Sequence, residues 1–200
     1  MMKVPKQKEF LKRIKAFEKH ELRHPIYKIS SNLINKSWNN IKDVTDGLII
    51  LFLVWNQAFY RYGYFDFRKL EDWVRKWKND LNILRKRKIE SFNIKDEEII
   101  EKLFNSLVEA LKIKNGSSPV AVSKALHLLA PSFFPLWDDA ISKAYGCLWS
   151  KSKFACNKYL EFCRKMQYLV NQVKNYKLPK NRSVLKLIDE YNYAKYTKNW

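Results

Sequence analysis

With 200 residues, 46% of them hydrophobic, the chain can bury a core of its own, which excludes an intrinsically disordered protein. Lys and Arg total 39 against 20 Asp and Glu, and the formal net charge of +19 favours a polyanionic partner such as nucleic acid. The longest apolar run, residues 47–55, is too short to cross a bilayer, and the first residues lack the apolar stretch of a signal peptide, so we expect a cytoplasmic protein with no membrane partner.

The composition favours helices throughout the chain. Glycine is scarce, with 4 residues, whereas the good helix formers Lys, Leu, Ile, Ala and Glu are plentiful. We therefore expect an all-α protein that forms a single compact unit over residues 1–200 and is a monomer. Division of that unit into two lobes, residues 45–110 and residues 1–44 with 111–200, is kept as an alternative.

Apolar residues recur every three or four positions and predict a series of amphipathic helices. Thr45 or Asp46 is expected to N-cap the third of them, Asp66 the fourth and Ser118 the sixth. In chain order the predicted helices cover residues 6–23, 26–42, about 47–60, 67–88, 93–113, 119–129, 139–149, 154–174 and 182–195.

The cysteine and histidine residues do not have the spacing of a metal site. Cys147, Cys156 and Cys163 lack the C-x2-C pattern of zinc sites, and an iron–sulfur cluster usually needs four cysteine ligands. We expect three buried free thiols and no iron–sulfur cluster. His127 lies in an apolar segment and is expected to be a hydrogen-bonded core or groove histidine.

The stretch "KNGSS" predicts a tight turn between two helices. Gly116 supplies the conformation that ends the first helix, and Ser118 caps the second. A helix N-terminus with serine hydroxyl groups and a lysine beside it is suited to bind a phosphate without reading the base, although an ordinary helix–helix loop is the alternative. The residues expected to contact DNA here are Lys114, Asn115, Gly116, Ser117 and Ser118.

The stretch "FPLWDD" places two acids directly after an aromatic segment. One acid is enough to cap the helix that follows, so the other carboxylate is left beside an aromatic wall. A fixed carboxylate near C1′ of a sugar stabilises the positive charge that develops when a glycosidic bond breaks. Asp138 is the candidate catalytic residue, with a plain N-cap as the alternative, and Trp137 and Phe134 are the candidates for a base pocket.

The order helix, "KNGSS" turn, helix, apolar–proline–apolar stretch and aspartate resembles the helix-hairpin-helix DNA glycosylases, of the endonuclease III and adenine glycosylase type. Aligned without gaps over about residues 114–146, Gly116 matches the first glycine of the family's hairpin and Asp138 its catalytic aspartate, whereas Ser118 stands where a second glycine is usual. The resemblance implies a two-lobed all-α fold, a monovalent cation at the hairpin, duplex DNA as partner, and removal of a damaged or mismatched base.

Two further expectations come from the same resemblance. The stretch "LVWNQAF" is similar to the family's early helix, which ends in a glutamine that enters the DNA, so Asn56 and Gln57 are expected to contact DNA. Members with lyase activity carry a lysine where Val120 stands, and Lys124 lies one helical turn deeper. If Lys124 reaches the site it adds this lyase activity, and otherwise water is the nucleophile.

Two other interpretations of the composition are kept. The protein is either a basic helical protein that binds nucleic acid without catalysis, or a helical partner protein of a defence or toxin system. In the first of these, Asp138 is only a helix cap.

Overall fold

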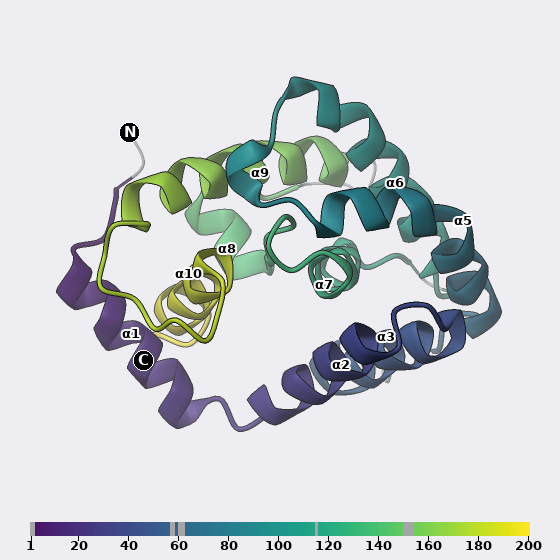
Figure 1. Cartoon of the computed structure of the whole chain (residues 1–200), viewed down its shortest axis with the longest axis horizontal. Helices are drawn as coiled ribbons and strands as arrows, with labels where there is room; N and C mark the ends of the chain where they lie inside the picture. The colour runs from purple at the N-terminus through teal and green to yellow at the C-terminus, as the bar shows by residue number, and fades with distance from the viewer. Residues whose placement is uncertain (1–2, 57–58, 60–62, 115, 150–153) are drawn as a thin grey trace.

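The computed structural model describes residues 3–56, 59, 63–114, 116–149 and 154–200. Over these ranges the protein is helical and has no β-strand, which confirms the all-α prediction (Figure 1). The α-helices are α1 (Gln7–His20), α2 (His24–Lys36), α3 (Ile41–Trp55), α5 (Phe67–Arg85), α6 (Glu97–Ala110), α7 (Pro119–Leu129), α8 (Asp139–Ala144), α9 (Ala155–Val173) and α10 (Val184–Asn192). Shorter elements are the 3-10 turns η1 (Ile89–Ser91) and η2 (Ile94–Asp96) and the π-helical turn η4 (Tyr193–Thr197).

Helix α7 is the centre of the fold. Figure 1 shows it nearly end-on, with α6 on one side and the α2–α3 pair on the other, and all three of these helices contact it. All of its residues are buried except Val120 and Lys124. A helix that is apolar on nearly every face is stable only when other helices enclose it, so α7 fixes the positions of the elements around it.

The two ends of the described chain pack together. Helix α1 contacts both α10 and η4, and the guanidinium of Arg13 donates to the backbone carbonyl of Trp200. In Figure 1 the C-terminus lies beside α1. The C-terminal turn is thereby held next to α8, which it also contacts. The division into two lobes stays a prediction.

Several of the expected helix boundaries are wrong. Helix α2, expected to reach residue 42, ends at Lys36, and α6, expected over residues 93–113, covers Glu97–Ala110, so Gly116 does not end it. Helix α3 begins at Ile41, because Asn40 caps it by accepting from the backbone N–H groups of Lys42 and Asp43, whereas Thr45 lies inside the helix. Helix α8 ends at Ala144, where a helix to residue 149 was expected, since Gly146 has φ +67° and turns the chain away. The predicted caps of α5 and α7 are confirmed.

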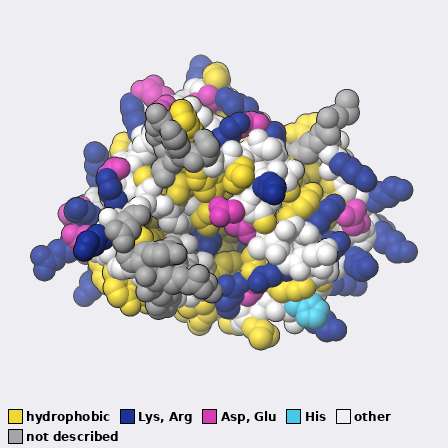
Figure 2. Space-filling view, turned by 180° about the vertical axis from the view of Figure 1, so that it is seen from behind, with side chains coloured by type: hydrophobic (Ala, Val, Ile, Leu, Met, Phe, Trp, Pro, Cys, Tyr) yellow, Lys and Arg dark blue, Asp and Glu magenta, His cyan; other side chains and the backbone are white. Residues whose placement is uncertain are grey.

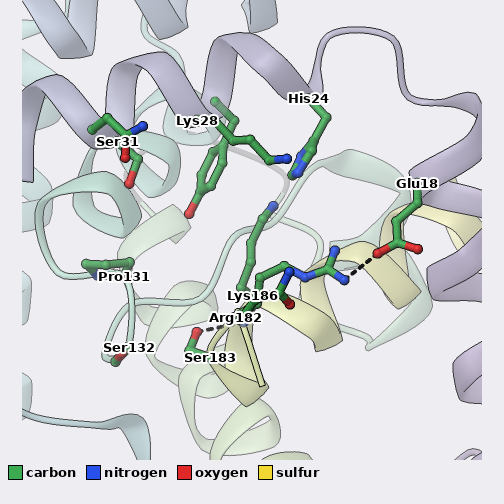
Figure 3. Close-up of a pocket in the computed structure, with 12 residues that line it drawn as sticks. Glu18, His24, Lys28, Ser31, Pro131, Ser132, Arg182, Ser183 and Lys186 are labelled. Atoms are coloured by element: carbon green, nitrogen blue, oxygen red, sulfur yellow. Dashed lines mark hydrogen bonds and ion pairs between the residues drawn. The ribbon is translucent and has the colours of Figure 1, made fainter. Parts of the chain in front are cut away.

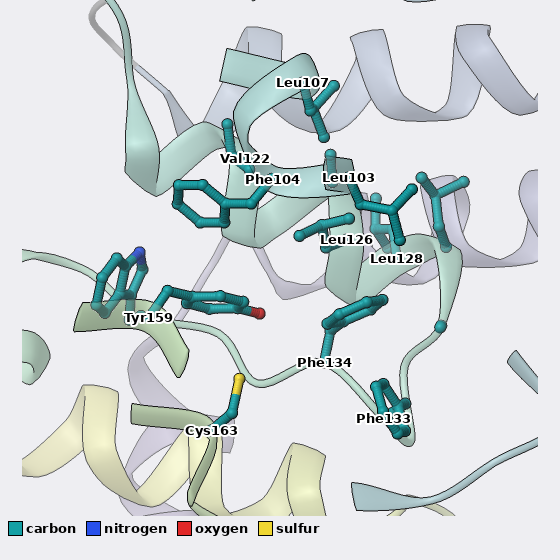
Figure 4. Packing of buried hydrophobic residues seen from close by; sticks show 14 of the residues in the cluster. Leu103, Phe104, Leu107, Val122, Leu126, Leu128, Phe133, Phe134, Tyr159 and Cys163 are labelled. Atoms are coloured by element: carbon teal, nitrogen blue, oxygen red, sulfur yellow. The ribbon is translucent and has the colours of Figure 1, made fainter. Parts of the chain in front are cut away.

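The core around α7 is filled by aromatic and branched side chains (Figure 4). Leu103 and Phe104 of α6, Leu126 of α7 and Tyr159 of α9 pack together there, and Phe104 and Tyr159 have ring centroids 5.1 Å apart. The three cysteines are buried free thiols, as predicted. Burial raises the pKa of the Cys156 thiol to about 12, so it stays protonated and packs as an apolar group.

The surface carries the positive charge in a dispersed form. On the face shown in Figure 2, Lys and Arg side chains lie around the edge with Asp and Glu side chains among them. No helix in the described part of the chain combines the length and the apolar character needed to span a bilayer.

Candidate functional site

A pocket of about 180 Å³ contains both residues that the sequence proposes as catalytic, Asp138 and Lys124. We call it the Asp138 pocket. Pockets for drug-sized ligands have volumes of roughly 300–1,000 Å³, so this one fits a single ring system better than a whole nucleotide. Other residues that line it and matter below are Arg23, Trp55, Trp137, Asp189, Tyr193 and Thr197.

The carboxylate of Asp138 accepts two hydrogen bonds, one from α8 and one from the C-terminal turn. Its Oδ1 accepts from the backbone N–H of Ile141 at 2.8 Å, which caps α8, and its Oδ2 accepts from the hydroxyl of Thr197 at 2.6 Å. Asp139, the second acid of the pair, is exposed. We expected one acid to cap the helix and the other to face the aromatic wall. This expectation is wrong, because Asp138 both caps the helix and lines the pocket.

Lys124 extends from α7 into the same pocket. Its ammonium group lies inside the protein and donates to the backbone carbonyl of Trp55, although the residue keeps some exposed surface. Burial lowers the pKa of Lys124 to about 8, and the negative charge of Asp138, which acts to raise this pKa, offsets only part of the effect. An amine with this pKa is deprotonated far more often near neutral pH than an ordinary lysine, which suits it to act as a nucleophile.

Of the two aromatic residues expected in the pocket, only Trp137 lines it. Trp137 is almost fully buried and stacks on Trp149 with ring centroids 4.6 Å apart, and its Nε1 donates to the carbonyl of Pro119. Phe134 lies in the core instead, 5.1 Å from the ring of Phe133. Its placement in the pocket was wrong because Phe134 lies at the end of the turn over residues 131–134, which directs it into the core, and the chain from 135 to 138 then leads away to the pocket.

The "KNGSS" segment forms a tight turn directly before α7. The backbones of Ile113 and Gly116 pair through two hydrogen bonds of 3.0 and 3.2 Å, and the φ of +155° at Gly116 favours glycine. Ser118 caps α7 by accepting from the N–H of Ala121 at 3.2 Å. Its oxygen also accepts from the side-chain amide of Asn56, which joins the end of α3 to this turn.

The structure describes only some of the other residues expected to contact DNA. Lys114 and Gly116 are exposed. Ser117 and Ser118 line a shallow hollow of about 310 Å³ together with Asp139 and Trp149. The expectations for Asn115 and Gln57 fall outside the described residues.

Sequence reasoning missed the residues that close the Asp138 pocket on its other side. The guanidinium of Arg23 lies 5.1 Å from the ring centre of Trp55 and donates to the hydroxyl of Tyr193 at 2.5 Å. Thr197 belongs to the same C-terminal turn. No local signal could have found these residues, because Arg23 and Tyr193 are 170 positions apart. The density of aromatic residues in the C-terminal segment was the one indication that it packs.

His127 is a hydrogen-bonded core histidine, as predicted. Its Nδ1 contacts the carbonyl of Phe134 at 2.8 Å, and its Nε2 contacts the hydroxyl of Tyr27 at 2.9 Å. Burial lowers the pKa of His127 to about 3, so the ring is neutral at physiological pH. Across the described residues, no group of three or more His, Cys, Asp or Glu side chains is placed to hold a metal ion.

No protein-family model, curated protein or solved structure matches this chain. The chemistry of the Asp138 pocket must therefore be argued from its own residues. A carboxylate, an amine of lowered pKa and an aromatic wall share a cavity at the N-terminus of α8, and Lys124 enters it from the middle of α7.

Proposed function

We propose that this protein is a DNA glycosylase that removes a damaged or mismatched base from duplex DNA. The observation that supports this most is that Asp138 and Lys124, both selected from the sequence as catalytic, line one pocket with an aromatic wall. Each of the two lies on a different element, and only the fold brings them together.

The proposed reaction begins with a base that leaves the duplex and enters the pocket, where Trp137 and Trp55 supply apolar surface for it. The bond between C1′ and the base nitrogen then breaks, and its electron pair goes to the base. C1′ becomes positively charged, and the carboxylate of Asp138 stabilises that charge because two hydrogen bonds hold it in place. A water oxygen bonds to C1′ and its proton goes to the departing base.

Lys124 is the second candidate nucleophile. In its deprotonated form the amine attacks C1′ in place of water, and loss of the base leaves a Schiff base that allows the strand to be cut. The lowered pKa of Lys124 supports this role. Nζ of Lys124 donates a hydrogen bond to the carbonyl of Trp55. The nitrogen has a lone pair for attack only after it loses a proton and turns toward the pocket.

DNA binding is assigned to the turn before α7. The positive end of the α7 helix dipole, the exposed Lys114 and the nearby Ser118 are suited to hold a phosphate of the backbone. The net charge of +19 adds long-range attraction that weakens with salt. This part of the proposal concerns the position of the strand and assigns no base preference.

The deciding experiment incubates the full chain with labelled duplexes that contain uracil, 8-oxoguanine, an alkylated purine, a mismatch or an abasic site, with and without borohydride. Base release from one of them is the expected result. A trapped covalent adduct that is lost in Lys124→Met assigns the nucleophile to Lys124, and base release without an adduct assigns it to water. Binding of every duplex with no release from any would instead identify a basic nucleic-acid-binding protein and reject catalysis.

A further inference from the structure

A second and larger pocket lies on a different part of the molecule. It has a volume of about 530 Å³, within the range of roughly 300–1,000 Å³ that small-molecule sites occupy. One face of α2, the segment after α7 and the beginning of α10 surround it (Figure 3). We call it the Lys28 pocket. It shares no described lining residue with the Asp138 pocket.

The Lys28 pocket is rich in hydrogen-bond donors and poor in acids. Three cationic side chains line it, and among its described lining residues Glu18 is the only acid. Figure 3 shows the side-chain nitrogens of Lys28, His24 and Lys186 directed toward one another. The uncharged polar residues that complete the lining are Ser31, Asn32, Ser132, Asn181 and Ser183.

The three cations differ in how far carboxylates already neutralise them. Arg182 donates to Glu18 and, at 2.6 Å, to the buried Glu190, and Lys186 donates to Asp189 at 2.5 Å. Lys28 has no ion-pair partner among the described residues, and it is exposed at the mouth of the pocket. Its charge is therefore available to a ligand without breaking an existing pair.

Two buried nitrogens at this pocket lack partners. Within the described part of the chain, neither Nδ1 of His24 nor Nε of Arg182 has a hydrogen-bond partner. A buried polar atom left without a partner is unfavourable, and a ligand that supplies an acceptor at this place would relieve the cost. Burial, with Lys186, Lys28 and Arg182 nearby, lowers the pKa of His24 to about 4, so the ring is neutral at physiological pH.

We propose that the Lys28 pocket binds a small phosphate ester. A phosphate group has three oxygens that accept hydrogen bonds. Lys28 and the Nε of Arg182 supply charge-assisted donors, and the neutral ring of His24 supplies an uncharged one. The pocket is larger than a phosphate, and its serine and asparagine side chains suit the hydroxyl groups of an attached sugar. The proposal does not depend on the glycosylase activity.

The test is a calorimetric titration of the full chain with inorganic phosphate, ribose 5-phosphate and ribose. Ribose 5-phosphate is expected to bind, inorganic phosphate to bind more weakly, and ribose not to bind. Lys28→Gln is expected to weaken ribose 5-phosphate binding at least roughly tenfold. Lys36→Gln is the matched control, because Lys36 is an exposed lysine of the same helix away from the pocket, and it is expected to leave binding unchanged.

Two results would overturn the proposal: no saturable binding of either phosphate compound, or an equal loss in Lys28→Gln and Lys36→Gln, which would show general electrostatic attraction. A short oligonucleotide with and without a 5′-phosphate distinguishes the source of the phosphate. If the oligonucleotide with the 5′-phosphate binds more tightly than the same oligonucleotide without it and Lys28→Gln removes the difference, the ligand is a nucleic-acid end. If it binds no more tightly, the ligand is a free metabolite.

A second readout does not rely on any variant. A bound phosphate places negative charge beside His24 and favours its protonated form, so its pKa is expected to rise from about 4 when ribose 5-phosphate is added. Histidine proton signals followed by NMR over a pH titration measure this. An unchanged titration of His24 at saturating ligand would contradict binding in this pocket.

Discussion

The hydroxyl of Thr197 donates a 2.6 Å hydrogen bond to Oδ2 of Asp138, 59 residues earlier in the chain. The other oxygen of the same carboxylate accepts from the backbone of α8, so Asp138 is held between a helix N-terminus and the C-terminal turn. A carboxylate with both oxygens engaged has a fixed orientation before any substrate arrives. Such preorganisation is what electrostatic stabilisation of a developing positive charge requires.

Replacement of Asp138 by Asn separates catalysis from folding. Asn is as good an N-cap as Asp, so Asp138→Asn keeps α8 capped and is expected to change the free energy of unfolding by less than about 1 kcal/mol. If the protein is the proposed glycosylase, its base release is expected to fall at least roughly 100-fold because the negative charge is lost. Duplex affinity, measured by fluorescence anisotropy, should be nearly unchanged. Asp139→Asn at the exposed neighbouring acid is the control, and equal activity of the two variants would reject the assignment.

Thr197→Val tests whether the C-terminal turn positions Asp138. The variant keeps the shape of the side chain and removes the donor, so it is expected to lower the free energy of unfolding by roughly 1 kcal/mol. For the proposed reaction, kcat should fall while KM stays the same, because Thr197 would act through Asp138 and not through substrate binding. Thr197→Ser retains a hydroxyl and should restore kcat. A parallel loss in the serine variant would show that the hydrogen bond is not the cause.

The lowered pKa of Lys124 has a consequence for stability. The unfolded chain, whose lysine has the ordinary pKa of 10.5, binds more protons than the folded chain between about pH 8 and that value. The contribution of Lys124 to the free energy of unfolding therefore increases as the pH rises through this window. Urea denaturation of the wild type and of Lys124→Met at about pH 7 and about pH 10 measures it, because effects of other groups cancel in the difference. The wild type should gain stability relative to the variant at the higher pH, and an equal difference at both would contradict a lowered pKa.

Ser118→Ala removes the cap of α7 and the partner of Asn56 together. Loss of an N-cap costs about 0.5–2 kcal/mol, and the central position of α7 places the expected value in the upper half of that range. Urea denaturation gives the value. Ser118→Asp keeps a capping oxygen and should recover most of the loss. If the Asp variant is as unstable as the Ala variant, the cap is not what Ser118 contributes.

The sequence predicted those features that depend on neighbours in the chain. The cap of α7 by Ser118 is a contact across three residues, and its signal is the residue type before an apolar run; the same signal narrowed the cap of α8 to two adjacent acids but did not choose Asp138 between them. The cap of α3 was assigned to the wrong residue because Thr45 and Asp46 resemble caps as well as Asn40 does. Only the backbone geometry distinguishes among several capping residues in one stretch.

The parts of the candidate site that the sequence did not indicate are contacts between distant segments. Arg23, Tyr193 and Thr197 reach the Asp138 pocket from opposite ends of the chain. Their residue types are common on protein surfaces, and no spacing relates them. Phe134 shows the reverse error, since an aromatic residue four positions before Asp138 packs into the core while Trp137 forms the wall.

Lys186 and Asp189 are three residues apart on α10 and form an ion pair, yet Lys186 lines the Lys28 pocket and Asp189 lines the Asp138 pocket. An anion that binds beside Lys186 competes with Asp189 for the same ammonium group. An anion that loosens this pair leaves the carboxylate of Asp189 less compensated where it faces Lys124. If both cavities bind ligands as proposed, occupancy of one therefore changes the affinity of the other, and thermodynamics requires that this linkage be reciprocal.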